Sequence, residues 1–280
     1  MTLQAAAIAS RGYNWKEMVS PNTSRLLLEE RRRAIRELIG DQGRTTIAEI
    51  VEQFGVSAVT ARNDLDALAS IGAVVRSHGG AVRCQEATHD YPVNFKAGLH
   101  RPEKARIGLA AAQLVQPNET IILDSGTTTW EIARHLKAMK LRGLTVITNA
   151  LNIASELADE PGIALIMVGG VLRQISFSFV GPQAEAMLRE MHADRFFLAV
   201  DGLDLEIGPS TPDVLEAQLN SRMMKIARET TVVADFSKLG RRSVSRIGPI
   251  ESIRRLVTDT RAPADFVKQL QDKGVEVLQV

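Results

Sequence analysis

The spacing of apolar residues over the first ninety positions predicts three short helices followed by a hairpin. Apolar residues recur at helical intervals over 24–39, 46–54 and 58–71. Gly55 separates the second and third helices and can take a left-handed backbone at little cost, and Ser57 is a suitable N-cap for the third helix. Two short apolar runs on either side of Gly79 and Gly80 predict a β-hairpin.

The third helix is expected to bury one face and to leave the other free. The residues expected inside are Val59, Leu65, Leu68 and Ile71, and Gly72 is expected to end the helix. Three helices with a glycine turn before the third, followed by a hairpin, form the plan of a winged helix-turn-helix. On this plan the N-terminal part of the third helix enters the major groove of DNA.

Residues at the start of the third helix and on the hairpin suit contact with double-stranded DNA. Arg62 can reach a guanine edge or a phosphate, and Asn63 an adenine edge. Ala58 and Ala61 are the small residues expected on the same groove-facing surface. The further candidates for contact with the groove or the phosphates are Ser57, Thr60, Arg76 and His78. The alternative for this region is a small helical domain that docks a protein, with Arg62 merely solvated.

An arginine-rich segment lies within the first predicted helix. Arginines at 31, 32, 33 and 36 are suited to phosphate contact. Glutamates at 29, 30 and 37 balance them, however, so the segment taken alone favours a solvated helix face.

The remainder of the chain alternates short apolar runs with helical patterns. Strands are expected at 120–124, 144–149, 163–170, 195–202, 230–237, 253–259 and 275–280, and helices at 103–115, 128–139, 150–159, 181–191, 213–229 and 262–273. Strands that alternate with helices predict a mostly parallel α/β sheet, in which ligands bind beyond the carboxyl ends of the strands.

The chain is therefore expected to divide into four parts. The segment 84–102 lacks sustained periodicity and carries two prolines, which is typical of a junction between domains. We expect a loose tail (1–24), a winged helix-turn-helix (25–84), a linker (85–102) and an α/β domain (103–280).

The turn after the first strand of the α/β domain suits an anion. Asp124 ends that strand, and Ser125, Gly126, Thr127 and Thr128 open the following helix. Amides at a helix N-terminus point toward an anion, and the helix dipole favours its charge. One hydroxyl would suffice for a plain N-cap, whereas positions 125–129 hold four. We therefore predict a phosphate site here.

The ends of the other predicted strands gather residues suited to a phosphorylated polyol. These residues are Asn149, Gly169, Gly170, Asp201, Asp204, Asp235 and Lys238. Carboxylates accept hydrogen bonds from hydroxyls, and a lysine balances the charge of a phosphate. Any one of these charges could instead form a structural ion pair, so the prediction depends on the group and not on a single member.

Composition narrows the class of protein. The apolar fraction of 45% is ordinary for a globular protein, and no run approaches the ~18 apolar residues of a membrane span. One cysteine, Cys84, excludes an internal disulfide and favours the cytoplasm. The histidines at 78, 89, 100, 135 and 192 lack metal-ligand spacing, and no nucleotide-binding glycine loop occurs, so neither metal nor cofactor is expected. Because the net charge is only +1, DNA binding would require a local basic surface.

Residues 25–280 resemble the DeoR-type bacterial transcriptional repressors. The N-terminal marks are "FGVS", T-x-R-x-D-L at 60–65 and R-x-H-G-G-A at 76–81, and the C-terminal marks are "DSGTTT", "VITN", "VGG", "FVGPQAE", "AVDG" and "VVADFSK". Many members have isoleucine at the position of Ala61 and arginine at that of Asn63, so the resemblance implies a different operator.

The resemblance also implies a binding site in the C-terminal domain. The matching segments are similar to the ribose-5-phosphate isomerase type of fold, in which a serine- and threonine-rich turn holds phosphate. Carried over, this gives Ser125, Gly126, Thr127 and Thr128 for phosphate and Asp201, Asp204, Glu216 and Lys238 around the sugar. Within the family the chain looks most like repressors of N-acetylgalactosamine and galactosamine utilisation, which implies an amino-sugar phosphate, although "TPD" at 211–213 departs from that pattern.

Three functions remain open at this point. The first is a DNA-binding repressor, not an enzyme, that senses a sugar phosphate and works as a homodimer or homotetramer, because helix-turn-helix proteins read palindromes as dimers. The second is a sugar-phosphate isomerase with an appended N-terminal domain, for which Glu216 is the candidate base. The third is a protein-docking adaptor.

Overall fold

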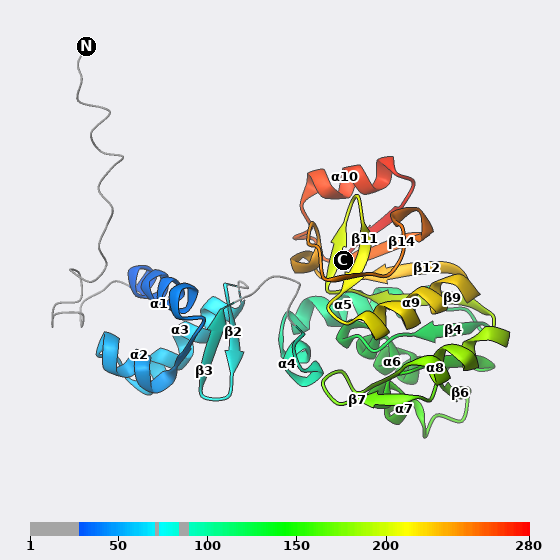
Figure 1. The fold of residues 1–280 in the computed structure, drawn as a ribbon, viewed down its shortest axis with the longest axis horizontal. Helices are drawn as coiled ribbons and strands as arrows, with labels where there is room; N and C mark the ends of the chain where they lie inside the picture. The colour runs from blue at the N-terminus through cyan, green and yellow to red at the C-terminus, as the bar shows by residue number, and fades with distance from the viewer. Residues whose placement is uncertain (1–27, 71–72, 84–89) are drawn as a thin grey trace, which may run out of the picture. The chain divides into compact units, whose positions relative to one another are not determined.

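The computed structural model describes residues 28–70, 73–83 and 90–280, and these form two compact units that we treat separately (Figure 1). The units are Met1–Cys84 and Gln85–Val280. The expected tail, the start of the first helix, Ile71, Gly72, Cys84 and the first five residues of the expected linker lie outside the described residues.

The N-terminal unit has the order of elements expected for a winged helix. Its elements are α1 (Leu28–Gln42), β1 (Arg44–Thr46), α2 (Ile47–Phe54), α3 (Ala58–Ser70), β2 (Val74–Ser77) and β3 (Gly80–Arg83). The prediction of three helices and a hairpin is confirmed. The strand β1 was not predicted, because three residues become a strand only by pairing with β3.

Short-range signals fix the helix ends of this unit. Thr46 and Glu49 form a capping box at the start of α2, where the Glu49 amide donates to the Thr46 hydroxyl and the Glu49 carboxylate accepts from the Thr46 amide. Gly55 ends α2 in the left-handed conformation, with φ of 64°. The Thr60 amide then donates to the Ser57 hydroxyl at 3.1 Å, which caps α3.

The buried face of α3 differs from the expected one. Leu65 and Leu68 are buried as expected, but Val59 is 62% exposed and Ala61, expected in the DNA-facing surface, is fully buried. Burial at 61, 64, 65 and 68 follows the helical period, and position 59 falls on the opposite side of that face. The free face of α3 therefore carries an exposed valine.

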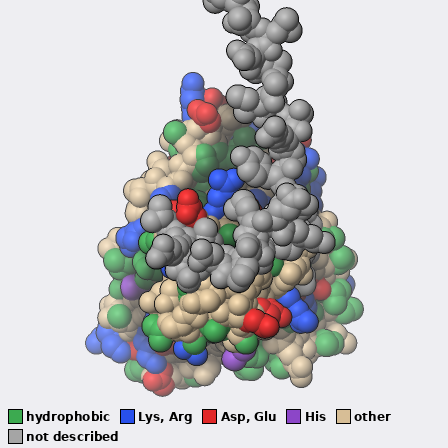
Figure 2. All heavy atoms as spheres, turned by 90° about the vertical axis from the view of Figure 1, so that its left-hand side faces the viewer, with side chains coloured by type: hydrophobic (Ala, Val, Ile, Leu, Met, Phe, Trp, Pro, Cys, Tyr) green, Lys and Arg blue, Asp and Glu red, His purple; other side chains and the backbone are tan. Residues whose placement is uncertain are grey.

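The arginine-rich segment is partly structural. The buried carboxylate of Asp64 on α3 accepts hydrogen bonds from Arg31 at 2.6 Å and Arg32 at 3.1 Å, so α1 and α3 are tied by three charged groups. Arg33 pairs with Glu37 one turn away. Where the face drawn in Figure 2 is not grey, basic and acidic side chains are interspersed and do not form one basic patch.

The C-terminal unit is built on a parallel sheet of seven strands in the order β15-β14-β12-β9-β4-β5-β6. These strands are β4 (Thr120–Leu123), β5 (Leu144–Thr148), β6 (Ile163–Met167), β9 (Ala193–Ala199), β12 (Ala227–Val233), β14 (Arg255–Thr258) and β15 (Glu276–Gln279). The predicted α/β class and each predicted strand are thereby confirmed, with ends shifted by a few residues.

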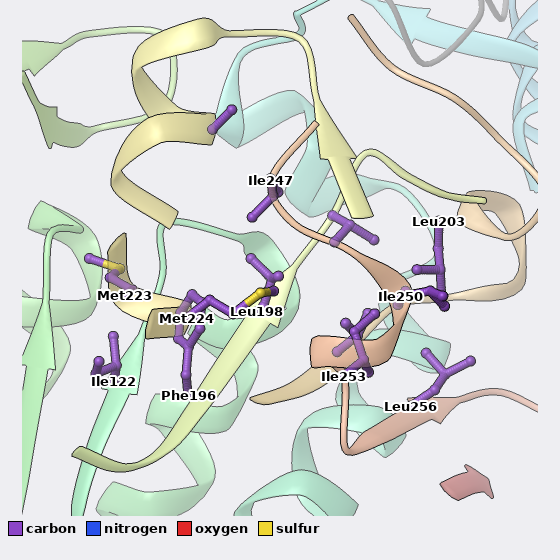
Figure 3. Close-up of a cluster of buried hydrophobic side chains, with 14 of the residues drawn as sticks. Ile122, Phe196, Leu198, Leu203, Met223, Met224, Ile247, Ile250, Ile253 and Leu256 are labelled. Carbon is purple, nitrogen blue, oxygen red and sulfur yellow. The ribbon is translucent and has the colours of Figure 1, made fainter. Parts of the chain in front are cut away.

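Helices cover both faces of this sheet. One face packs on α5 (Arg101–Ala112), α6 (Thr127–Met139) and α7 (Leu151–Leu157), and the other on α8 (Pro182–Met187), α9 (Val214–Ile226) and α10 (Ala264–Asp272). Alternate residues of a strand enter opposite cores: Ile122 and Phe196 lie in one, and Leu123 and Phe197 in the other. Figure 3 shows Met223 of α9 over the first of these cores.

Three features of this unit were not foreseen. Residues 90–102, which we expected to be linker, contain α4 (Val93–Gly98) and the start of α5. A hairpin of β7 (Val171–Arg173) and β8 (Ser178–Val180) follows β6, and β10 (Gly202–Asp204), β11 (Gly208–Thr211) and β13 (Ser245–Arg246) form a small antiparallel sheet. Strands of two to four residues are too short to show a periodic pattern. No helix among the described residues is long and apolar enough to cross a membrane.

Candidate functional site

The predicted DNA-contacting residues divide into free and engaged side chains. Arg62 and Asn63 are exposed on α3. Ser57 and Thr60 are engaged with each other, because their hydroxyl oxygens lie 2.9 Å apart in addition to the capping bond. They remain close to the helix N-terminus, where amides favour a phosphate.

The hairpin candidates divide in the same way. The Arg76 guanidinium lies 2.9 Å from the Asp66 carboxylate of α3 and donates to the Gly80 carbonyl, so it braces the hairpin against α3. His78 is exposed in the turn between β2 and β3. Of the six predicted residues, Arg62, Asn63 and His78 therefore present side chains that the fold itself does not use.

A cavity in the C-terminal unit lies at the carboxyl ends of β4, β9 and β12. Eight predicted effector residues line it: Asp124, Ser125, Gly126, Thr127, Thr128, Asp201, Glu216 and Lys238. The structure also brings there residues that were not predicted, chiefly Tyr91, Lys96, His100, Lys104, Thr211 and Asn220. The cavity thus combines the start of α6 with three lysines and several carboxylates.

The first turn of α6 offers donors that the protein leaves free. Gly126 is the N-cap and has no side-chain cap bond, so the amides that follow it are unpaired. Among the described residues, the hydroxyls of Ser125, Thr127 and Thr128 make no hydrogen bond to other protein groups. A Cβ at Gly126 would lie 2.1 Å from the Cβ of Ala199, so only glycine permits this close approach of α6 to β9.

Asp124 holds this turn in place through hydrogen bonds. Its carboxylate accepts hydrogen bonds from the Thr129 hydroxyl at 2.8 Å and from the amides of Gly126 at 3.1 Å and Ala199 at 2.9 Å. Burial raises the pKa of Asp124 to about 7, and these hydrogen bonds oppose the rise. Because its lone pairs are taken by its own turn, Asp124 positions the site.

Asp201 and two lysines form the opposite wall. Lys96 lies 3.0 Å and Lys238 3.8 Å from the same oxygen of Asp201. Burial alone would raise the pKa of Asp201, but the two ammonium groups outweigh it and hold that pKa below its usual value. Asp235 is buried nearby, and its pKa is likewise lowered by Lys238 and Lys104 against the effect of burial.

Lys104 is the least satisfied charge of the cavity. It projects from α5, is only 4% exposed, and donates to the Lys96 carbonyl at 2.5 Å, while no carboxylate lies within ion-pair distance of it among the described residues. Burial lowers the pKa of Lys104 to about 8; Asp235 and Asp201 act against this shift, whereas Lys238 and Lys96 add to it. An anion that entered the cavity would supply this ammonium with a partner of opposite charge.

Glu216 is held by an arginine from the β7–β8 hairpin. Arg173 lies 2.6 Å from the Glu216 carboxylate and 2.5 Å from that of Asp90. The hydroxyl of Ser178 also donates to Glu216 at 3.0 Å. Asp90 in turn lies 3.4 Å from Lys96, so one chain of charges runs from α9 to the segment before α4.

Four predicted effector residues do not line the cavity. Asp204 pairs with Arg242 at 2.9 Å and accepts the amides of the β10–β11 turn. The Asn149 amide group donates to the Phe179 carbonyl, which holds β8 beside β5. Gly169 and Gly170 form the turn between β6 and β7.

Sequence reasoning did not predict Lys96, Lys104 or Arg173 as residues of the cavity. Lys96 and Arg173 lie in short elements whose partners are distant in the sequence, so no local signal marks them. Lys104 did leave a signal: it shares one helical face with Ile107, Gly108 and Ala111, all of which are buried. A lysine on a face that is otherwise apolar indicates either a buried ion pair or a ligand site.

Comparison with known proteins identifies both units. Residues 31–87 match the DeoR-like helix-turn-helix domain, and residues 99–260 match the DeoR C-terminal sensor domain. A protein of Escherichia coli O157:H7, described as a candidate transcriptional repressor of the aga operon, is 41% identical over 90% of this chain and 93% of its own length. The transcriptional repressor AccR of Agrobacterium fabrum is 35% identical over 83% and 90%.

A further relative and one solved structure are also similar to this chain. The transcriptional repressor GlcR of Bacillus subtilis is 32% identical over 89% of this chain and 95% of its own. Among solved structures, the ribose 5-phosphate isomerase of Plasmodium falciparum shares 17% identity and a TM-score of 0.36 over 49% of this chain and 52% of its own. That likeness is too distant to support a function.

The isolated charge of Lys104 predicts a pH-dependent cost to stability. Its pKa falls from 10.5 to about 8 on folding, so the cost is absent above pH 10.5, develops as the pH falls, and is complete below pH 8. At about 1.4 kcal/mol per tenfold change in proton affinity, it amounts to roughly 3 kcal/mol. Lys104→Met should raise the unfolding free energy by roughly 2 kcal/mol at pH 7, since the lost hydrogen bond to Lys96 offsets part of the gain.

Urea unfolding of the full chain at pH 7 and pH 9.5 measures this effect. The gain should shrink at the higher pH, and stabilisation by inorganic phosphate should weaken in the variant. Lys268→Met, at an exposed lysine of α10, is the control and should change little. A destabilised Lys104→Met protein at pH 7 would show that Lys104 is already satisfied.

Proposed function

The chain belongs to the DeoR family of transcriptional regulators, and from this premise we propose that its sensor unit binds a phosphorylated sugar or amino sugar that changes the affinity of the N-terminal unit for operator DNA. The observation that carries this proposal is the cavity in which the free donors of the α6 turn face Lys96, Lys104 and Lys238. The kinship with a protein described as a repressor of the aga operon supports an amino-sugar phosphate.

The phosphate is proposed to bind at the first turn of α6. Unpaired amides at a helix N-terminus and hydroxyl donors are the groups that bind phosphate in proteins. Thr127 and Thr128 supply hydroxyls, and the free ammonium of Lys104 supplies the charge that the turn lacks. A sugar without phosphate would leave these groups unpaired, so it should bind much more weakly.

The sugar is proposed to lie against Asp201 and Glu216. Carboxylates accept hydrogen bonds from sugar hydroxyls, and both side chains line the cavity. Each is held at present by a cation, Asp201 by Lys96 and Glu216 by Arg173. Sugar hydroxyls would therefore compete with these two cations for the same oxygens.

This competition supplies a route from the sensor unit to the DNA-binding unit. Lys96 and Asp90 belong to residues 90–98, which begin five residues after the start of the second unit at Gln85. A ligand that draws Lys96 away from Asp201 loosens the hold on this segment. A difference of about 1–3 kcal/mol between the two states would alter operator affinity several-fold to over a hundred-fold.

We propose binding without turnover. Isomerisation of a sugar phosphate needs a base beside its first two carbons, and Glu216 is the candidate. Its carboxylate is neutralised by Arg173 at 2.6 Å and accepts from Ser178, which disfavours a role as base. NMR spectra of sugar phosphates incubated with the protein should stay unchanged, and conversion that disappears with Glu216→Gln would establish the isomerase instead.

The remaining features of the proposal concern the partners of the full chain. We propose a cytoplasmic homodimer or homotetramer that binds double-stranded operator DNA, since paired helix-turn-helix units match palindromic half-sites. Light scattering on the purified chain measures the oligomeric state, and a monomer that still binds operator tightly would contradict the proposed dimer or tetramer.

The first prediction of the proposal concerns the phosphate. Thr127→Val and Thr128→Val together remove two hydroxyls while keeping side-chain shape, so affinity for the sugar phosphate should fall at least about tenfold, because hydrogen bonds to charged groups contribute about 1.5–3 kcal/mol each. Calorimetry measures this affinity, and operator binding without effector should be unchanged. Thr231→Val is the control, since the Thr231 hydroxyl is buried without a hydrogen-bond partner. Unchanged affinity in the double variant would move the phosphate elsewhere.

The second prediction concerns the route to DNA. Asp90→Asn removes the charge that joins Lys96 to Arg173 and leaves Asp201 and Glu216 intact. The variant should bind the sugar phosphate at least as well as the native protein, while the effect of the ligand on operator affinity should shrink by about threefold or more. Gel shift with and without ligand measures it, with Asp159→Asn as a control at an exposed pair with Lys137. A full response in Asp90→Asn would exclude this route.

A further inference from the structure

An exposed valine in the first turn of α3 has no part in the fold. Val59 is 62% exposed, whereas the residues that pack α3 against the core are Ala61, Leu65 and Leu68. A β-branched residue is also a weaker helix former than alanine, so helix formation does not favour valine at this position. Folding therefore gives no reason for this side chain.

The neighbours of Val59 on the free face of α3 are hydrogen-bonding groups. Arg62 and Asn63 follow it at intervals of three and four residues, so all three side chains project from the same side of the helix. One turn further, Asp66 is paired with Arg76 of the hairpin at 2.9 Å. Apart from the single methyl group of Ala58, the open part of the face thus presents one apolar group, one guanidinium and one amide.

This combination suits the edges of base pairs in the major groove. An amide reads adenine, a guanidinium reads guanine, and the apolar feature that the groove displays is the C5 methyl group of thymine. We propose that Val59 contacts the methyl group of a thymine close to the base pair that Asn63 reads, and so determines part of the operator sequence. This inference rests on DNA binding by the N-terminal unit and not on the effector proposal.

The surroundings of Val59 disfavour a protein partner on this face. A docking surface for protein needs a contiguous apolar area, and apart from the small Ala58 the exposed neighbours of Val59 on α3 are polar or charged. A single exposed valine is common on protein surfaces, and Val244 in the sensor unit, 63% exposed, is such a case. What distinguishes Val59 is its place at the helix end that enters the groove.

The test uses the full chain and DNA alone. Binding sites are first selected from a randomised duplex library, and each thymine of the selected site is then replaced, one at a time, by deoxyuridine, which lacks only the methyl group. Affinities are measured for the native chain, for Val59→Ala and for Val244→Ala as a matched exposed valine. A thermal melt of each variant checks that folding is unchanged.

At one thymine of a half-site, loss of the methyl group should weaken the native chain about fourfold, the equivalent of about 0.8 kcal/mol for one buried methyl-sized group. The same replacement should have no effect on Val59→Ala, while Val244→Ala should behave as the native chain does. The non-additivity at that one position identifies the contact.

Three results would overturn the inference. Val59→Ala and the native chain could respond equally to every replacement, Val59→Ala could bind the selected site with native affinity, or the selection could enrich sites that hold no thymine. Selection of no preferred sequence would likewise contradict base reading by this face.

Discussion

Parallel strands end at the same edge of a sheet, and the sensor unit depends on this constraint. Because β4, β9 and β12 are neighbours in register, the residues that follow them meet at one place, and Asp124, Asp201 and Asp235 gather there. Three carboxylates so close together repel one another unless cations accompany them. The lysines at 96, 104 and 238 supply positive charge near these carboxylates and lower the pKa of Asp201 and Asp235.

The balance of these charges is incomplete. Asp201 has two ammonium partners and Asp124 accepts hydrogen bonds from its own turn and from β9, but Lys104 is buried with a carbonyl as its hydrogen-bond partner and, among the described residues, has no carboxylate within ion-pair distance. A buried group with an imperfect partner lowers the stability of the empty protein. In a sensor this is an advantage, since the ligand that completes the arrangement gains binding free energy that the protein alone could not retain.

Both units contain ion pairs between residues that are distant in the sequence. In the N-terminal unit, Asp64 holds Arg31 and Arg32 and so fixes the orientation of α3. In the sensor unit, Asp90 and Arg173 connect the walls of the cavity in which we propose that the effector binds. The two sets differ in their shared carboxylate: Asp64 is 1% exposed, which favours rigidity, whereas Asp90 is 20% exposed and is more accessible to a polar ligand.

The sequence by itself determined the architecture and the turn at 125–128 that lines the cavity. Helical spacing, capping residues and glycines are local signals, so the winged helix, the alternation of strands and helices, and the cluster at 125–128 could be found without a structure. Ala61 and Val59 were assigned to the wrong faces because they lie two residues apart, and an error of two residues, about half a helical turn, exchanges the two faces of a helix. The tertiary structure alone decided that Lys96, Lys104 and Arg173 join the cavity and that Asp204 and Asn149 do not line it. Those choices depend on pairings across many tens of residues, and no local pattern encodes which distant charge a side chain will meet.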